Sequence, residues 1–279
     1  MPDVGKVRLG YWRIRGFGAP PRMLLHYADI DFEDVTYTVK RLDDGSFWRE
    51  WDSDPLANEM LSESSKAYLA AQKNPYANLP WLEHDGQFVT QSNAVIMYIG
   101  RLANLNGDSE SEISKNEQVL FQIYDLRYAA LMLAYGPPEA ADGTRAEDSY
   151  FGNIMPSFFH TDGRLNVHLT KLESWLKFNG TSYFSADRPL TADFHVFEVL
   201  DLHEGWAAHL KKGSLLENYP LLKDFYERML ALDGLKSYFA SDASKWTYHS
   251  PRALTFPGNI NGYGPDRVLD GKTFMFADQ

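Results

Sequence analysis

Cysteine is absent from this chain of 279 residues. Its absence excludes disulfide bridges, thiolate metal sites and cysteine nucleophiles together. Long apolar runs are absent as well, since no stretch reaches the roughly 20 residues of a membrane-spanning helix. The opening sequence, MPDVGKVRLGYW, lacks the apolar core of a secretory signal. We therefore expect a soluble, cytoplasmic protein without a membrane span.

Positive charge is scarce overall but concentrated in one segment. Lys and Arg total 27 against 38 Asp and Glu, which gives a net charge of −11. Nucleic-acid phosphates require a basic face, so we expect no nucleic-acid partner. Residues 6–22 nevertheless contain no acid, and their basic side chains are Lys6, Arg8, Arg13, Arg15 and Arg22. This basic segment predicts either a site for a small anion or ion pairs with the acidic remainder, and both readings stay open.

Metal-binding patterns are also lacking. The eight histidines form no HExxH motif and no tight cluster with carboxylates. His195, His203 and His209 lie only in part at helical spacing. We therefore expect structural roles for these histidines and no metal cofactor.

The first hundred residues alternate between strand and helix patterns. Strands are predicted over 7–12 and 34–39, with a helix over about 20–29 that opens on Pro20 and Pro21. A polar stretch follows, in which 62–72 suits a short helix. Strands over 79–83 and 87–90 and a helix over 92–104 come next. This order predicts a mixed four-stranded sheet with helices packed on it, a thioredoxin-like α/β fold.

The remainder of the chain shows helical patterns only. Apolar periodicity predicts helices over about 112–135, 164–178, 192–210 and 219–231. A stretch rich in Gly and Pro interrupts them, and the last forty residues have the composition of an ordered coil on a surface. We expect a thioredoxin-like domain over 1–104, an all-α helical domain over 110–240 and a C-terminal coil extension over 241–279.

The stretch NLPWLEHDGQFVTQSNAVIMYI, residues 78–99, places polar residues where a hairpin ends and a helix begins. Ser92 suits an N-cap, and helix N-termini attract anions, so Gln91 and Ser92 could hold a carboxylate. Ser92 could equally cap its own helix and do nothing more. Pro80 cannot donate to a sheet ladder, which leaves the backbone of Leu79 able to pair with an extended peptide.

This stretch resembles the glutathione-binding core of the glutathione transferases. LGYWRIRGFGAPPRMLLHYADIDFEDVTYT, residues 9–38, and VLDLHEGWAAHLKKGSLLENYPLLKDFYERMLALDGLKSYFAS, residues 199–241, are similar to the mu class in particular. The similar segments follow the family order over most of the chain. The resemblance implies a thioredoxin-like domain, a helical domain and a homodimer. It also implies glutathione as co-substrate and a hydrophobic electrophile as the second substrate.

The resemblance further implies roles for individual residues. Tyr11 matches the tyrosine that hydrogen-bonds the glutathione sulfur and is the expected catalytic residue. Leu79 would pair its backbone with the cysteinyl unit, before a cis Pro80, and Gln91 and Ser92 would hold the γ-glutamyl carboxylate. The other implied glutathione contacts in this half are Trp12, Phe17 (a leucine in most of the family), Asn78 and Trp48, the last facing the glycine carboxylate.

Two implied roles fall in the helical half. Asp125 matches an acid that reaches the γ-glutamyl amine bound by the partner subunit. Tyr135 matches a second tyrosine near the electrophile, where it could act as an acid. The glutathione-contacting lysine of the family has two candidates here, Lys66 and Lys73, and neither aligns cleanly.

The implied chemistry is consistent with elementary acid–base arguments. A free thiol has a pKa near 8.5, so only a few per cent is thiolate at pH 7. Lowering that pKa by two units needs roughly 3 kcal/mol, which one charge-assisted hydrogen bond in a polarised site can supply. A phenol suits the task because its ordinary pKa of about 10 keeps it protonated. Without cysteine, thiolate transfer to an electrophile is favoured over thiol–disulfide exchange.

The chain departs from the family pattern in several places. Insertions at about 52–77 and 140–163 adjoin the implied glutathione and electrophile sites. The second contains Tyr150, Phe151, Phe158 and Phe159, which could line the electrophile pocket or cover a helix. Thr191 stands two residues before Asp193 instead of the usual three, which puts the family's capping box in doubt.

Three functions remain open at this stage. The first is conjugation of glutathione to electrophiles. The second is a binding or structural protein on the same fold with little or no turnover. The third is a glutathione-dependent isomerase, which would use the same thiolate. The natural electrophile cannot be predicted, because irregular loops build its pocket.

Overall fold

The computed structural model describes residues 5–43, 47–52, 66–135, 158–209, 213–250 and 253. These residues belong to two compact units, the first within Met1–Asn106 and Leu232–Pro251 and the second within Gly107–Ala231 and Arg252–Gln279. No helix in the described part of the chain is long and apolar enough to cross a membrane. The domain boundaries expected from sequence stay a prediction. The segment Leu232–Pro251 is grouped with the first unit by its contacts.

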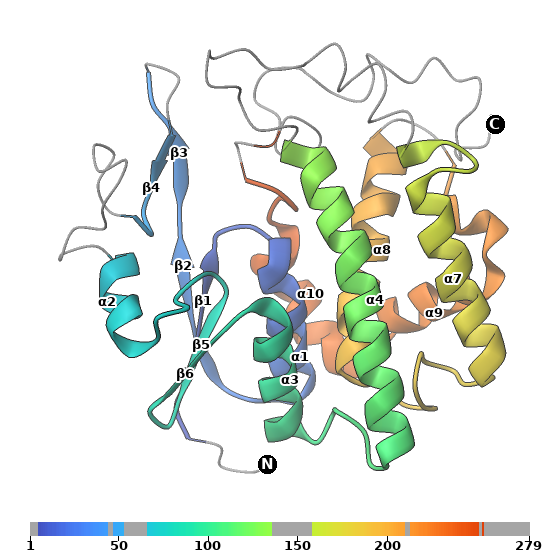
Figure 1. Cartoon of the computed structure of the whole chain (residues 1–279), viewed down its shortest axis with the longest axis horizontal. Helices are drawn as coiled ribbons and strands as arrows, with labels where there is room; N and C mark the ends of the chain where they lie inside the picture. Colours follow the sequence, from blue (N-terminus) through green and yellow to red (C-terminus); the bar gives the residue numbers. More distant parts are fainter. Residues whose placement is uncertain are drawn as a thin grey trace. The chain divides into compact units, whose positions relative to one another are not determined.

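A mixed four-stranded sheet forms the centre of the first unit (Figure 1). Its strands, in spatial order, are β2 (Phe32–Tyr37), β1 (Val7–Trp12), β5 (Trp81–His84) and β6 (Gln87–Thr90). Strands β1 and β2 are parallel and are joined through α1 (Ala19–Tyr27), while the other neighbours are antiparallel. The predicted thioredoxin-like arrangement is confirmed.

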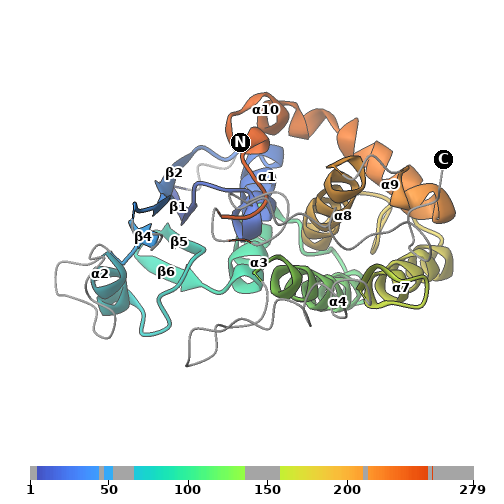
Figure 2. The same cartoon turned by 90° about the horizontal axis from the view of Figure 1, so that it is seen from above.

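The two faces of this sheet are covered differently. Helices α1 and α3 (Ser92–Ala103) lie on one face and α2 (Lys66–Lys73) lies toward the other (Figure 2). Leu9 and Leu82, which are register partners on β1 and β5, are fully buried. On the opposite face Tyr37, Trp51 and Trp81 form an apolar cluster with Ala67 and Ala70 of α2. Burial of these aromatic side chains stabilises the α2 side of the sheet.

Gly10 is required by the close approach of Trp81. A Cβ atom at Gly10 would lie 2.0 Å from Cε2 of Trp81, its neighbour on β5.

A further small sheet pairs β3 (Val39–Arg41) with β4 (Phe47–Arg49) in antiparallel register. This hairpin was not predicted, because the polar stretch after residue 39 shows little apolar alternation.

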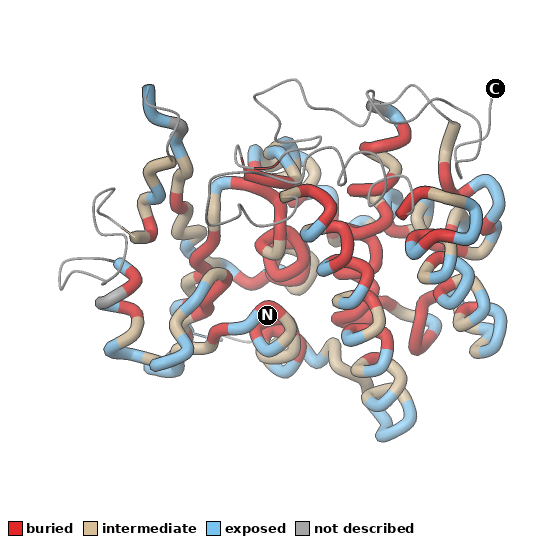
Figure 3. Tube along the Cα trace, turned by 45° about the horizontal axis from the view of Figure 1, so that its top comes forward, coloured by how far each residue is buried: buried red, intermediate tan, exposed pale blue. Residues whose placement is uncertain are grey.

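Four long helices dominate the described part of the second unit. They are α4 (Glu110–Tyr135), α7 (Arg164–Asn179), α8 (Thr191–His209) and α9 (Pro220–Leu230). Helix α8 packs against α4 and α9, and its first ten residues are all buried (Figure 3). The four helices agree with the predicted spans to within a few residues. After residue 231 the chain forms α10 (Lys236–Ala240), which packs on α1 in the first unit.

The start of α8 is capped by a residue from α4. The side-chain oxygen of Asn116 accepts from Ala192 N at 3.0 Å, and its amide donates to Thr191 Oγ1 at 2.6 Å. Asp193 accepts from Leu190 N at 2.7 Å, which is half of a capping box. The doubt about the usual box is therefore resolved, since Asn116 supplies the acceptor that a Ser or Thr N-cap would provide.

Candidate functional site

The sheet register brings distant residues to one edge. Gly10 pairs with Trp81, and Trp81 pairs with Thr90 on β6. One residue beyond this row, on the same side of it, the three strands reach one edge of the sheet. The residues at that position are Tyr11, Pro80 and Gln91. Strand pairing alone therefore gathers the tyrosine, the proline and the start of α3.

Tyr11 lies at this edge with its hydroxyl held by the following loop. Its side chain is 5% exposed. The backbone N–H of Phe17 donates to Tyr11 Oη at 3.0 Å. Gly16 has φ +41°, and a Cβ there would lie 2.6 Å from Oη. In the bond from Phe17 the phenol oxygen is the acceptor, so its own proton is directed elsewhere.

The segment before β5 carries the expected cis bond. The Leu79–Pro80 peptide bond is cis, and Pro80 is buried. Leu79 precedes the first strand residue, and its N–H donates to Asn78 Oδ1 at 2.8 Å. Trp12 and Leu79 both pack against the cluster around Trp81. A peptide that paired with the Leu79 N–H would therefore take the place of the Asn78 side chain.

The start of α3 differs from the sequence prediction in one respect. Helix α3 begins at Ser92, and Gln91 occupies the N-cap position without a side-chain cap bond. The prediction that Ser92 is the N-cap is therefore wrong, because the chain turns into the helix one residue earlier. Gln91 has φ +74°, a region that non-glycine residues rarely adopt and that is often found at binding sites. The exposed Gln91 and the buried Ser92 thus flank a positive helix end.

The lysine candidates are both held by carboxylates. Lys66 pairs with Glu50 at 2.5 Å and lies over the ring of Tyr37. Lys73 forms an ion pair with Glu83, and this hydrogen bond lowers the pKa of Glu83. A role for either lysine in binding glutathione stays a prediction.

Trp48 lies on the β3–β4 hairpin and not in the main sheet. Its ring is half-buried, and the ammonium of Lys40 stands 5.5 Å from the ring centre. The next tryptophan, Trp51, is buried in the cluster on the α2 face. Of the two, only Trp48 is exposed enough to meet a ligand.

The basic segment is explained largely by contacts within the first unit. Arg8 pairs with Glu33 at 3.1 Å and with Glu83 at 2.9 Å, across both neighbouring strands. Buried Arg22 pairs with Asp34 at 2.8 Å. Lys6 also pairs with Glu33. Arg13 and Arg15 instead lie over the rings of Trp246 and Tyr248.

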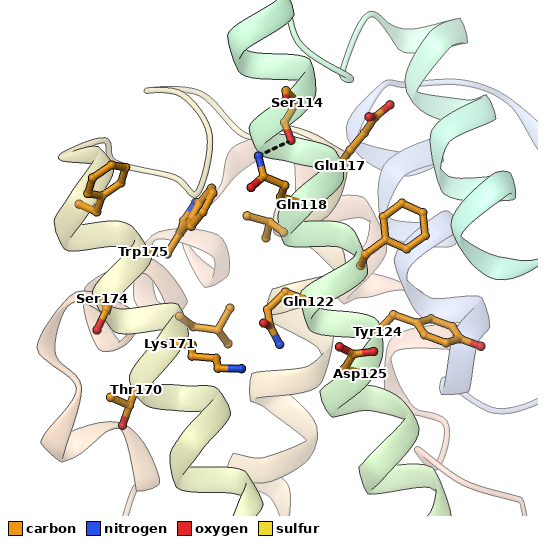
Figure 4. Close-up of a pocket in the computed structure, with 14 residues that line it drawn as sticks. Ser114, Glu117, Gln118, Gln122, Tyr124, Asp125, Thr170, Lys171, Ser174 and Trp175 are labelled. Carbon is orange, nitrogen blue, oxygen red and sulfur yellow. Dashed lines mark hydrogen bonds between the residues drawn. The ribbon is translucent and has the colours of Figure 1, made fainter.

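A groove runs between α4 and α7 in the second unit (Figure 4). It has a volume of about 940 Å³. Gln122 and Lys171 point into it from opposite helices, and Asp125 lies one turn further along α4. Its apolar lining includes Phe121 and Phe178, which are 58% and 82% exposed. Exposed aromatic side chains that lie together in one groove are typical of protein interfaces.

Asp125 and Tyr135 belong to the second unit, whereas the other predicted site residues belong to the first. Tyr135 is the last residue of α4 and is half-buried. Their predicted roles stay predictions.

The described part of the second insertion belongs to a hydrophobic core. The rings of Phe158 and Phe159 lie 6.4 and 5.3 Å from that of Trp206. They therefore pack within the helical unit. Tyr150 and Phe151 lie outside the described residues, as do residues 53–65 of the first insertion.

Two histidines of α8, His195 and His203, are fully buried. Burial lowers the pKa of His203 to about 4 and, together with the charge of Arg127, that of His195 to about 3. Nδ1 of His203 donates to the carbonyl of Val199 at 2.6 Å. Among the described residues no group of three or more His, Asp or Glu side chains could hold a metal ion.

Sequence reasoning missed the contacts made by Trp246 and Tyr248. These residues lie in a coil, and no local pattern links them to the loop after β1. The sequence offered one weak signal, namely aromatic residues in the coil together with several arginines in the basic segment.

Comparisons with known proteins give a consistent result. Residues 60–101 match the family model for the glutathione S-transferase N-terminal domain, and residues 124–242 match that for the C-terminal domain. Glutathione S-transferase Mu 1 of Bos taurus is 30% identical over 84% of this chain and 90% of its own length.

Solved structures agree in fold. The pi-class glutathione S-transferase of Onchocerca volvulus has a TM-score of 0.61 and 26% identity over 88% of this chain and 99% of its own. The glutathione S-transferase Blo t 8 has a TM-score of 0.63 and 23% identity over 88% and 98%.

Proposed function

Because this chain belongs to the glutathione S-transferase family, a family of transferases, we propose that it conjugates the glutathione thiolate to electrophilic small molecules. The Tyr11 hydroxyl stabilises the thiolate. The observation that carries this proposal is the bond from Phe17 N–H to Tyr11 Oη, at the edge where Pro80 and Gln91 also lie.

The geometry of Tyr11 suits this role. An N–H donated to the phenol oxygen polarises the O–H bond, which makes the hydroxyl a better donor to a developing anion. Burial removes competing water, so the hydrogen bond to sulfur is stronger than it would be in solvent. Such a bond favours the thiolate over the thiol and lowers the thiol pKa. The thiolate is the nucleophile, and the electrophile's leaving group departs with the electron pair of the broken bond.

The rest of the tripeptide follows the edge of the sheet. The backbone of Leu79 pairs with the cysteinyl unit, in place of the bond from Leu79 N to Asn78. Gln91 and Ser92 hold the γ-glutamyl carboxylate at the N-terminus of α3, where backbone donors and the helix dipole favour an anion. Further proposed contacts come from Trp12, Phe17, Asn78 and Trp48.

The second substrate is a hydrophobic electrophile, with Tyr135 beside it. A phenol there could protonate the oxygen of an opening epoxide or the carbanion formed by addition to an alkene. The absence of cysteine supports transfer to an electrophile over disulfide chemistry. We propose a cytoplasmic location, in keeping with the composition.

The protein is proposed to act as a homodimer that uses the groove between α4 and α7. The exposed rings of Phe121 and Phe178 would be covered by a second copy. Asp125, which lines the same groove, would then reach the γ-glutamyl amine in the partner's site.

A direct assay separates this proposal from a binding protein without turnover. Purified protein is mixed with glutathione and an aryl halide, and conjugate formation is followed by absorbance. Conjugation that depends on both substrates supports the proposal. Tight glutathione binding without conjugation of aryl halides, epoxides or activated alkenes would instead favour a binding role. Isomerisation of a substrate without consumption of glutathione would favour an isomerase.

A further inference from the structure

The segment Trp246–Ser250, called here the C-terminal strap, lies along the loop that follows β1. Two backbone hydrogen bonds join them, from Arg15 N to Thr247 O at 2.8 Å and from Gly16 N to Tyr248 O at 3.1 Å. Loop and strap both belong to the first unit. The strap therefore adds a short stretch of paired backbone to a loop that has no regular secondary structure of its own before residue 16.

Aromatic rings of the strap hold the arginines of the loop. The guanidinium carbon of Arg15, a residue only 7% exposed, lies 4.2 Å from the centre of the Tyr248 ring. The guanidinium carbons of Arg22 and Arg13 lie 4.8 and 5.7 Å from that of Trp246. Cation–π contacts are strongest where water is excluded, and Arg15 and Arg22 are both buried, so both contacts help to hold the loop against the strap.

The loop in turn holds Tyr11. The carbonyl of Arg15 accepts from Gly18 N at 2.9 Å and from Ala19 N at 2.8 Å, which closes the turn around Phe17. The N–H of Phe17 then donates to Tyr11 Oη. A continuous path of contacts thus runs from Tyr248 through Arg15 to the hydroxyl.

We propose that the C-terminal strap orients the Tyr11 hydroxyl, with Tyr248 as a positioning residue that acts through Arg15 and the Phe17 N–H. The proposal rests on the proposed function of Tyr11. Hydrogen-bond strength falls steeply with misalignment, so a loop released from the strap donates less well to Oη. The phenol proton then meets the sulfur at a poorer angle, and less of the bound glutathione is thiolate.

The test uses the full chain with Tyr248→Ala, and measures the pKa of the bound glutathione thiol by the ultraviolet absorbance of the thiolate. We expect that pKa to rise by about one unit, which means roughly tenfold less thiolate below the pKa. The acid limb of the pH profile of kcat/KM for the electrophile, measured at saturating glutathione, should move to higher pH by the same amount. Tyr248→Phe keeps the ring and should behave as the wild type. Tyr76→Ala removes a side chain that is 77% exposed in the same unit and serves as the matched control.

An unchanged thiol pKa in folded Tyr248→Ala protein, with an unchanged melting temperature, would overturn the proposal. Should that variant not fold, Tyr248→Leu keeps the apolar volume without the π face and is measured instead, with the same expectation. Tyr11→Phe is the reference. If Tyr11→Phe raises the thiol pKa and the Tyr248 variants do not, only the strap proposal fails. If Tyr11→Phe has no effect, the proposed function fails and the strap proposal fails with it.

Discussion

At the scale of single residues, Gly16 is a sensitive position beside Tyr11. Its φ of +41° and the 2.6 Å separation between a Cβ and Tyr11 Oη exclude any side chain without movement. Gly86, in the β5–β6 turn, has φ +78° with nothing within 4 Å of a Cβ. The two glycines therefore share a backbone conformation that disfavours other residues, but differ in what a methyl group would meet.

Replacing each glycine by alanine separates these effects. Both variants should lose about 1–2 kcal/mol of unfolding free energy from the left-handed backbone. Only Gly16→Ala should also displace the phenol, lowering kcat/KM by roughly tenfold or more, as expected when a key hydrogen bond is misplaced. Steady-state kinetics and urea unfolding of the pair provide the measurement. Equal activity in the two variants would mean that the loop tolerates a side chain beside Tyr11.

His203 is a second residue with a measurable signature. Its pKa is lowered to about 4 by burial, against an ordinary 6.5. Only the unfolded chain binds a proton there between these values, so stability that is present above pH 6.5 is lost as the pH falls toward 4.

The contribution of His203 to the pH dependence of stability is obtained by comparing the wild type with His203→Phe. Between pH 6.5 and 5 the wild type should lose about 1.6 kcal/mol of unfolding free energy that His203→Phe does not lose, because the slope rises toward 1.36 kcal/mol per pH unit as the unfolded histidine becomes protonated. Urea unfolding of both proteins at the two pH values gives the difference directly, so other titrating groups cancel. Parallel pH dependence of the two proteins would show that His203 is accessible to protons in the folded state.

At the scale of elements, the cap of α8 is a contact between helices distant in sequence. Asn116→Ala removes the acceptor for Ala192 N and the donor to Thr191 Oγ1 in a buried place. We expect a loss of about 1–3 kcal/mol in unfolding free energy. Gln118→Ala, at an exposed position of the same helix, should stay within about 0.5 kcal/mol of the wild type. Similar losses in both would assign the cost to α4 and not to the cap.

Local signals made the main elements predictable. Alternating apolar residues marked β1 and β2, and Pro20 and Pro21 marked the start of α1. The site residues at the sheet edge were identified by resemblance. The register explains why they meet, since Tyr11, Pro80 and Gln91 each neighbour a member of the paired row Gly10, Trp81 and Thr90. Their assignment to glutathione stays a proposal.

Other features could not be predicted because their causes are distant in sequence. Asn116 caps a helix that begins 75 residues later, at Thr191. Tyr248 touches Arg15 from a coil with no periodic pattern. The sequence predicted the N-cap of α3 one residue too late. Gln91 has a positive φ, and because glutamine usually avoids that conformation, nothing in the sequence indicated it.

At the scale of the whole molecule, the groove between α4 and α7 predicts an assembly. Phe178 is 82% exposed there, and Leu230 on α9 is 46% exposed outside the groove. If a second copy covers the groove, sedimentation equilibrium of the wild type should give a mass twice the 31.9 kDa of one chain. Phe178→Ser should raise the dimer dissociation constant by about tenfold, which corresponds to about 1.4 kcal/mol and lies within the range for truncation of a buried aromatic anchor. Leu230→Ser should leave it unchanged, and a monomeric wild type at micromolar concentration would exclude this use of the groove.

The central claim concerns a proton on Tyr11 directed at the glutathione sulfur. Its most direct measurement is the pKa of the thiol in the complex with glutathione, for the wild type and for Tyr11→Phe, by ultraviolet titration of the thiolate. We predict a wild-type value about two units below the 8.5 of a free thiol and a Tyr11→Phe value close to that of the free thiol. Bound thiols of equal acidity in the two proteins would contradict the account.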